Sequence, residues 1–399
     1  MPVRLAALVT ACPSQSFTQG VLDRLLEGYF FGGQYRNPRC RIVSFYLAQP
    51  SPGDLVQERS EELGVPIHHT VPAALMAGAN ALNVDGVLLL AADGQYPQNE
   101  YGQRLLPRHD LFRQVCRVFH QSRRSAPVFL TGPLAVEWEK IAWMENEVQK
   151  AGFPLFCGSY LPLTWRLPPV HLPENAPILE ALVVAFEPSE EQEYHALEAL
   201  QAILERREGG ESGVVEIHHW AEEAFWQAGA EGEWSWELLT AALSRSDTPQ
   251  GNAVLDGRPE DLVATGAVRQ LAQHPYAYGL RYADGVRGTV VVLPGVVRDY
   301  LFAAQVGEEV ISAQFLLPPP PNTAHLSALV EAIERFFIEG RSPVPPARAA
   351  LVAGALEACR KLHATGGTTV QTPELAKIAY RPTAEDRFAD SEALNPPAP

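Results

Sequence analysis

A short, uninterrupted apolar run in the first half of the chain limits the possible folds most strongly. Within residues 84–103, VDGVLLLAADGQYPQNEYGQ, six apolar residues from Val87 to Ala92 precede Asp93 and Gly94, and a polar segment follows. A run of this length without alternation is typical of a strand that is buried on both faces of a parallel sheet. Open α/β sheets bind ligands where the carboxyl ends of such strands run into loops. We therefore expect function just after this run.

Strands and helices alternate along the first part of the chain. The sequence pattern predicts strands at 3–10, 40–48, 65–68, 87–92, 128–130 and 155–158. It predicts helices at 17–31, 53–63, 71–78, 109–122 and 134–151. This alternation indicates βαβ units and a doubly wound parallel sheet. Residues 1–158 are therefore expected to form a Rossmann-like domain of the dinucleotide-binding type.

The second part of the chain follows a different pattern. Prolines are frequent in an extended crossing segment at 162–177. Strands are then predicted at 179–186 and 214–218, and helices at 190–207, 236–244, 323–339 and 347–365; one helix and a loose loop are expected within 221–261. Residues 278–317, with the hairpin turn Asp284-Gly285, predict an antiparallel meander. We expect an α+β domain at 159–380 with a large, mostly antiparallel sheet, and a disordered tail at 381–399.

Charge and cysteine content exclude several classes of function. The formal net charge of −16 argues against nucleic acid and against an anionic membrane surface, because both attract Lys and Arg. No apolar run approaches the roughly 18 residues of a membrane span. The five cysteines are scattered without a CxxC motif, which predicts free thiols and no structural metal. We expect a cytoplasmic protein whose first apolar segment is a strand rather than a targeting signal.

Several segments, taken in order, resemble one enzyme family. LVQERSEELGVPIHHTVPAAL followed by VDGVLLLAA is similar to the second helix and fourth strand of the Gfo/Idh/MocA oxidoreductases, the relatives of glucose–fructose oxidoreductase and inositol dehydrogenase. GLRYADGVRGTVVVL looks like the hairpin of their sheet, and LSALVEAIERFFIEGRSPVPPARAALVAGALEACRKLHATGG like their closing helices. The resemblance implies an NAD(P)-binding first domain, a sugar- or polyol-like substrate and hydride transfer. It also implies a homo-oligomer formed through the exposed face of the large sheet.

The chain departs from this family at three places. The glycine-rich turn is TACPSQS at 10–16, so a phosphate near the following helix N-terminus must fit beside Pro13 and side chains. The second strand ends SFYLAQ, without an acid for an adenosine ribose. The family's Glu-Lys-Pro motif corresponds to Thr131-Gly132-Pro133, which keeps the proline and lacks the lysine. The candidate cofactor-binding residues are Thr10, Cys12, Ser14, Gln15 and Ser16.

Glu191 and His195 are the candidate catalytic residues. They resemble the Asp-x-x-x-His stretch that opens a helix in the family, with Glu191 in place of the aspartate. Residues four apart share one face of a helix, so both side chains could reach one substrate. A histidine can move a proton to or from a hydroxyl as hydride leaves its carbon. The alternative is an acidic helix start that complements the helix dipole, with His195 on the surface.

Five further residues are candidates for substrate binding: Tyr96, Asn99, Glu100, Trp165 and Arg166. The first three lie on the polar loop after the apolar run, where they either bind a polyhydroxy ligand or cap the loop. The last two lie on the crossing segment, where an aromatic ring beside a guanidinium suits a sugar or a carboxylate. A packed tryptophan beside an exposed arginine is the ordinary alternative. We expect Tyr96 and His195 to line the cleft from opposite sides.

Two functions are compatible with these residues. The first is a divergent NAD(P)-dependent oxidoreductase that acts on a sugar- or polyol-like substrate, with His195 as the acid/base. The second is a non-catalytic ligand-binding or scaffold protein that kept the fold and lost hydride chemistry. The missing lysine and the altered turn favour the second function, whereas the polar loop and His195 favour the first. Analogy of fold leads us to the first.

Overall fold

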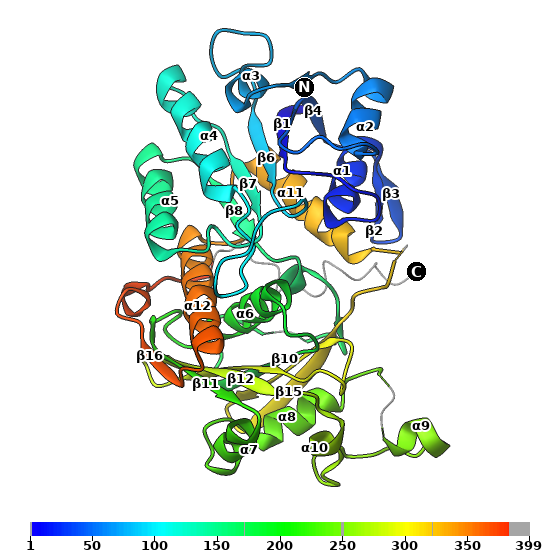
Figure 1. Cartoon of the computed structure of the whole chain (residues 1–399), viewed down its shortest axis with the longest axis vertical. Coiled ribbons are helices and arrows are strands. Elements are labelled where there is room, and N and C mark those ends of the chain that lie inside the picture. The colour runs from blue at the N-terminus through cyan, green and yellow to red at the C-terminus, as the bar shows by residue number, and fades with distance from the viewer. Residues whose placement is uncertain (1, 171, 249–250, 321, 383–399) are drawn as a thin grey trace.

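Two large β-sheets, each covered by helices, lie one above the other along the longest axis of the molecule (Figure 1). The computed structural model describes residues 2–170, 172–248, 251–320 and 322–382. Most of the tail expected at 381–399 therefore lies outside the described residues. Within the described part of the chain, no helix combines the length and the apolar composition that a membrane crossing requires.

The first sheet confirms the expected doubly wound architecture. Its six strands are all parallel, in the order β5-β4-β1-β6-β7-β8. They are β1 (Val3–Val9), β4 (Cys40–Leu47), β5 (Ile67–His68), β6 (Gly86–Leu90), β7 (Val128–Thr131) and β8 (Leu155–Gly158). Every residue of β6 is buried, as the apolar run predicts. The strand order reverses between β1 and β6, and ligands of doubly wound sheets bind at such a point.

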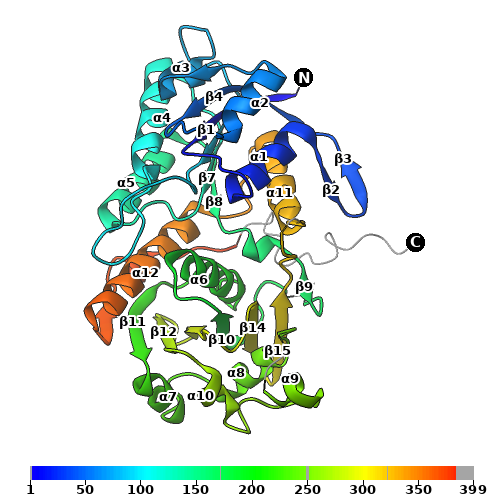
Figure 2. The same cartoon turned by 45° about the vertical axis from the view of Figure 1, so that its right-hand side comes forward.

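Helices cover both faces of this sheet. One face packs against α3 (Val71–Met76), α4 (Arg108–Ser122) and α5 (Trp138–Ala151). The other face packs against α1 (Phe17–Glu27), α2 (Leu55–Leu63) and α11 (His325–Glu339). The last strand of this sheet, β8, ends at Gly158, but α11 returns from much later in the chain to the core of the first sheet. Figure 2 shows α11 beside α1.

The prediction of a helix at 17–31 is wrong for its last residues, because α1 ends at Glu27. The chain forms a hairpin there, with β2 (Tyr29–Phe31) antiparallel to β3 (Gln34–Arg36). Gly32 and Gly33 have φ angles of 59° and 74°. A two-residue type I′ turn needs positive φ at both central positions, which glycine adopts without strain. The glycine pair therefore closes a hairpin instead of ending a helix.

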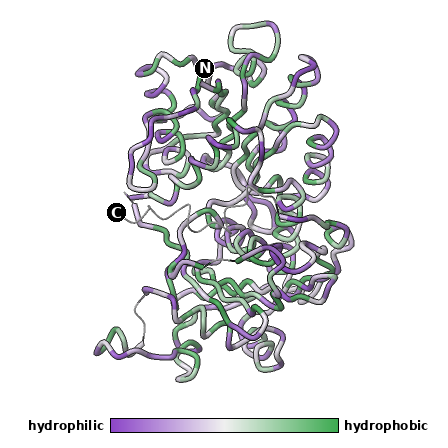
Figure 3. The backbone as a smooth tube through the Cα atoms, turned by 180° about the vertical axis from the view of Figure 1, so that it is seen from behind, coloured by the Kyte–Doolittle hydropathy of each residue, from purple (hydrophilic) through white to green (hydrophobic). Residues whose placement is uncertain are grey.

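The second sheet has eight strands in the order β16-β11-β12-β13-β10-β14-β15-β9. They are β9 (Arg166–Leu167), β10 (Ile178–Ala185), β11 (Val214–Ala221), β12 (Tyr276–Tyr282), β13 (Arg287–Val292), β14 (Tyr300–Val306), β15 (Glu309–Phe315) and β16 (Thr369–Gln371). The sheet is mostly antiparallel, as expected, and only β10 and β13 pair in parallel. Figure 3 shows hydrophobic stretches of the backbone in the interior of both halves of the molecule.

The expected meander at 278–317 is wrong in its middle. Strand β10 lies between β13 and β14, so these two strands, which are neighbours in the sequence, do not pair. Seven of the eight residues of β10 are buried, which requires neighbours and covering layers on both sides. A strand that is apolar on both faces therefore takes a central position in the sheet, although it is remote in sequence from the hairpins around it.

Two helices cover the inner face of the second sheet and connect the two halves of the molecule. Helix α6 (Glu190–Leu204) lies directly on β10 and β13. Helix α12 (Pro346–Thr365) packs against α6 with residues such as Leu351 and Leu356, and against the first core with Ala349 and Ala353. Because α12 contacts both cores, it fixes the position of α6 relative to the first sheet.

Buried ion pairs join α12 to α6. Arg348 Nη2 lies 3.1 Å from Glu198 Oε2, and Arg348 Nη1 lies 3.2 Å from Glu205 Oε1. Further along α12, Arg360 Nη1 lies 2.9 Å from Glu193 Oε1. All three glutamates are fully buried. Removing one member of such a pair leaves an uncompensated buried charge, which costs about 3–5 kcal/mol.

The outer face of the second sheet is covered by the chain itself. The segment expected to hold one helix and a loose loop forms α7 (Glu223–Ala230), α8 (Trp236–Leu243), α9 (Asn252–Asp256) and α10 (Ala267–Leu271). Helices α7, α8 and α10 bury the outward side chains of β10, β12, β13 and β14. Trp234 is fully buried there, and its ring stacks on Phe225 at 4.8 Å between centroids. Helices α7, α8 and α10 therefore cover the part of this face that β10, β12, β13 and β14 form, and a homo-oligomer through the sheet stays a prediction.

The covering segment should contribute a large part of the stability of the second half. We predict that Trp234→Ala lowers the free energy of unfolding by about 3–5 kcal/mol, because the vacated volume lies between the sheet and its cover. Urea unfolding measures this loss. The matched control is Leu255→Ala, at a side chain that is 82% exposed, which should change stability by less than about 0.5 kcal/mol. Similar small effects for both variants would contradict the packing role.

A histidine pair between α12 and β11 should make stability depend on pH. The rings of His219 and His363 lie 5.1 Å apart between centroids. Burial lowers the pKa of both, and burial together with His219 and Arg360 lowers the pKa of His363 to about 4. The unfolded state then binds more protons than the folded state between pH 6.5 and 4, so stability falls as the pH falls through this window.

We predict that the loss for His363 amounts to at most about 3 kcal/mol between these pH values. Urea unfolding at several pH values should show a shallower decline for His363→Asn than for the unchanged protein. His69→Asn, at an exposed position just after β5 of the first sheet, serves as the control and should retain the original decline. An unchanged slope in His363→Asn would reject this source of pH dependence.

Candidate functional site

A pocket of about 200 Å³ lies between the two halves of the protein. Its first wall is formed by residues that follow β6, β7 and β8, at 92–93, 132–133 and 159–160. Its opposite wall is the start of α6, with Glu190, Glu191, Tyr194 and His195. The pocket therefore lies at the carboxyl edge of the parallel sheet, where doubly wound sheets bind ligands.

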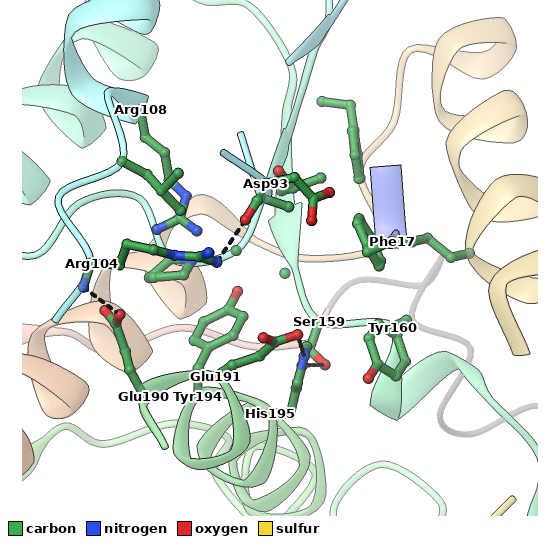
Figure 4. Close-up of a pocket in the computed structure, with 18 residues that line it drawn as sticks. Phe17, Asp93, Arg104, Arg108, Ser159, Tyr160, Glu190, Glu191, Tyr194 and His195 are labelled. Carbon is green, nitrogen blue, oxygen red and sulfur yellow. Dashed lines mark hydrogen bonds and ion pairs between the residues drawn. The ribbon is translucent and has the colours of Figure 1, made fainter. Parts of the chain in front are cut away.

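His195 is held in this pocket by Ser159. The imidazole is buried, and its Nδ1 lies 2.6 Å from the Ser159 hydroxyl oxygen. The same oxygen accepts a hydrogen bond from the Leu161 backbone N–H at 2.9 Å, which fixes the hydroxyl. The other ring nitrogen, Nε2, lies 3.9 Å from Glu191 Oε1. The structure thus brings both candidate catalytic residues to the pocket, with one imidazole nitrogen anchored and the other on the side of Glu191 (Figure 4).

Two arginines approach the pocket from the opposite side (Figure 4). Arg104 Nη2 donates to the Ala92 carbonyl at 2.7 Å, and Arg108 Nε donates to the Ala91 carbonyl at 3.1 Å. Arg108 is only 8% exposed, and burial lowers its pKa. Glu190 accepts a hydrogen bond from the Arg104 backbone N–H at 2.9 Å, and burial raises the pKa of its carboxyl group.

Arg108 occupies the space beside the position where the family motif places a lysine. Gly132 has a φ angle of 75°, and a Cβ atom added there would lie 2.6 Å from Arg108 Nη2. A side chain at position 132 and the observed Arg108 conformation therefore exclude each other. This chain lacks the lysine, and the guanidinium of Arg108, the first residue of α4, lies beside position 132 instead.

The turn before α1 is closed by hydrogen bonds within the chain. Thr18 N donates to Asp93 Oδ2 at 3.1 Å, and Gln19 N donates to the Ser16 hydroxyl at 3.1 Å. Cys12 N donates to Asp54 Oδ2 at 2.8 Å. Carboxylates favour the positive end of a helix, so the start of α1 is an anion site that the chain fills with its own Asp93.

The remaining candidate cofactor residues surround this turn. The Thr10 hydroxyl donates to the Asp93 carbonyl at 2.6 Å, while Ser14 and Gln15 are exposed. Cys12 is buried, and burial together with Asp54, Asp23 and Asp93 raises the pKa of its thiol to about 12. These carboxylates make the turn locally negative.

The five candidate substrate residues do not line the pocket. The side chain of Asn99 caps its own loop, because Oδ1 accepts hydrogen bonds from the backbone N–H groups of Tyr101 and Gln103. Glu100 is exposed, and Tyr96 lies beside Gly94. Arg166 is buried and donates to the carbonyl groups of Pro162 and Thr164, and Trp165 is partly buried against the first core. Asp93, three residues before Tyr96, lines the pocket instead.

Sequence reasoning did not find Ser159, Arg104 and Arg108. Ser159 follows the end of β8, so the rule that ligands bind at carboxyl ends of parallel strands pointed to it. Arg108 begins α4, where the helix dipole disfavours a cation. A cation in this position is a weak signal of a role other than helix stability. Arg104 has no local signal, because only the path of the loop brings it to the pocket.

Comparison with known proteins gives a similarity in structure but none in sequence. No protein-family model matches the chain, and no curated protein is significantly similar to it in sequence. Among solved structures, GenD2 from gentamicin A biosynthesis, in complex with NAD, superposes with a TM-score of 0.56 at 12% identity, covering 93% of this chain and 96% of that one.

Two inositol dehydrogenases show a comparable similarity. Apo scyllo-inositol dehydrogenase from Lactobacillus casei has a TM-score of 0.54 at 9% identity, and 93% of this chain and 98% of that one are covered. Myo-inositol 2-dehydrogenase from Lactobacillus plantarum has a TM-score of 0.52 at 10% identity, with 93% and 99% covered. At such low identity the similarity shows the fold. The chain therefore has the two-part fold of the inositol dehydrogenases, as its resemblance to the Gfo/Idh/MocA oxidoreductases predicted.

Proposed function

We propose that the protein is a divergent NAD(P)-dependent oxidoreductase that acts on a small polyhydroxy substrate in the pocket between its two halves. The observation that carries this proposal is the Ser159–His195 pair at the carboxyl edge of a doubly wound sheet. An acid/base group is needed there because oxidation of an alcohol removes a hydroxyl proton as well as a hydride.

The pair is suited to proton transfer in both directions. A serine hydroxyl either donates a hydrogen bond to Nδ1 or accepts one from it, so Ser159 remains bonded to the imidazole in both neutral tautomers. Nε2 is then free to take a proton from a substrate hydroxyl or to return it to a carbonyl oxygen. The His195 imidazole also holds the pKa of the Glu191 carboxyl below its usual value. Glu191 therefore stays ionised beside Nε2 and stabilises the imidazolium when it forms.

A nicotinamide cofactor would supply the hydride acceptor. The start of α1 has the donors for its diphosphate, since the helix N-terminus already holds a carboxylate. Thr18 and the residues of the 10–16 turn are the groups that would hold it, and Asp93 would leave the helix end for this purpose.

A second function, ligand binding without hydride chemistry, is favoured by one specific observation. Asp54 and Asp93 accept hydrogen bonds from the Cys12 and Thr18 backbone N–H groups, and Asp23 adds a further negative charge nearby. If the protein is a ligand-binding protein without hydride chemistry, the ligand binds in the pocket. The hydrogen bonds at the start of α1 then have a structural role, which is to hold the ends of β1 and β6 together.

Asp93 distinguishes the two functions. We predict that Asp93→Asn tightens the binding of NADH or NADPH roughly tenfold, or about 1.4 kcal/mol, because asparagine keeps the acceptor for Thr18 and removes the charge that competes with a phosphate. Titration followed by nicotinamide fluorescence measures both affinities. Asp110→Asn, an equal charge change at an exposed position on α4, should leave them unchanged. The oxidoreductase proposal is rejected if neither dinucleotide binds the unchanged protein or Asp93→Asn at millimolar concentration.

The role of His195 has a separate test. With a polyol substrate that the protein oxidises, His195→Ala should lower kcat by about 10²–10⁴-fold and leave the affinity for the dinucleotide unchanged. Ser159→Ala should lower kcat less, and should alter its pH profile because the imidazole loses a fixed partner. Glu145→Gln, at a position on α5 that does not line the pocket, is the control for both. Full turnover in His195→Ala would reject proton transfer by this residue.

A further inference from the structure

The two pocket arginines have no carboxylate partner in the part of the chain that the structure describes. Their side chains donate to the carbonyl groups of Ala91 and Ala92 through one nitrogen each. Neither takes part in an ion pair with a described residue, although the protein contains buried arginine–glutamate pairs elsewhere. A guanidinium carries five N–H donors, so most donors of Arg104 and Arg108 remain available on the pocket side.

An unpaired buried cation is costly, and three features of this site add to the cost. Arg108 is 8% exposed, and burying an ion without a partner costs several kcal/mol. It begins α4, where the helix dipole is positive. Arg104 lies close enough to lower the pKa of Arg108 by like-charge repulsion. An anion between the two guanidinium groups would relieve all three effects.

The acidic groups of the pocket do not serve as this anion. The negative charge of Glu190 partly offsets the effect of burial on the pKa of Arg108, but Glu190 Oε2 accepts a hydrogen bond from the Arg104 backbone N–H, and Oε1 is buried without a hydrogen-bond partner among the described residues. Asp93 is bonded to the start of α1, and Glu191 lies beside His195. Each of these carboxyl groups is thus held by, or directed toward, another element.

We propose that Arg104 and Arg108 bind an oxyanion of the ligand, a carboxylate or a phosphate group, at the end of the pocket opposite His195. Guanidinium groups bind both oxyanions through paired N–H donors. Figure 4 places the arginines on one side of the pocket and His195 with Ser159 on the other. A ligand that spans the pocket therefore presents an oxyanion at one end and a hydroxyl group at the other, as a polyhydroxy acid or a sugar phosphate does. This inference rests on the proposed role of the pocket as the ligand site, and it does not require hydride transfer.

Binding of simple probes to the full chain without a dinucleotide tests this inference. Isothermal titration at constant ionic strength would compare D-gluconate with sorbitol, which has similar hydroxyl groups and no charge, and with inorganic phosphate. We expect gluconate, phosphate or both to bind at least tenfold more tightly than sorbitol. A preference for gluconate assigns a carboxylate, and a preference for phosphate assigns a phosphate group. Equal, weak binding of all three probes would overturn the inference.

Variants locate the site. Arg104→Gln and Arg108→Gln should each weaken binding of the preferred anion at least tenfold, while Arg113→Gln, on the exposed side of α4, should leave it unchanged. Arg104 is only partly buried, so its variant keeps the test valid even if Arg108→Gln does not fold. Unchanged anion binding in Arg104→Gln would overturn the assignment. Anion binding without dinucleotide binding would support this inference and reject the oxidoreductase proposal, whereas the reverse result would reject this inference alone.

Discussion

The position of the pocket depends on the ion pairs between α6 and α12. Helix α6 carries one wall of the pocket, and its buried Glu193 and Glu198 form ion pairs with arginines of α12. Helix α12 also packs into the core of the first sheet. Because an unpaired buried charge is so unfavourable, α6 has little freedom to move relative to α12. His195 is therefore held at a fixed distance from strand ends that belong to the other half of the protein.

The pocket contrasts with this network in how its charges are arranged. In the α6–α12 interface Arg348 and Arg360 form ion pairs with carboxylates of the chain, whereas the side chains of Arg104 and Arg108 donate hydrogen bonds to backbone carbonyl groups. At the start of α1 the opposite holds, since Asp93 already fills an anion site. The protein thus satisfies its own charges at the place where a dinucleotide fold usually binds phosphate, and leaves positive charge unsatisfied some distance away. A cofactor diphosphate at the turn would have to displace Asp93, whereas an oxyanion at the pocket arginines would displace no carboxylate that is paired with them.

Local patterns predicted the first half of the fold well. Parallel strands buried on both faces are continuous apolar runs, and the glycines that follow helices mark their ends, as Gly64 and Gly152 do. The errors occur where pairing is not local. The sequence around Gly32 and Gly33 fits a helix end and a hairpin equally, and the insertion of β10 between β13 and β14 depends on burial by α6 and α8. The tryptophans at 226, 234 and 236 gave no sign that they cover a sheet face.

The sequence by itself determined the class of fold and the succession of βαβ units along the first half of the chain. It also determined that Glu191 and His195 share one face of a helix. Both results follow from periodicity and spacing, which are local properties of a helix or strand. Tertiary structure alone decided which polar residues share a pocket. Ser159 and His195 are 36 residues apart, and the Arg104 side chain reaches the pocket only through the path of its loop. Such encounters depend on how two cores pack against each other, and no periodicity in the chain encodes the distance between side chains on different layers.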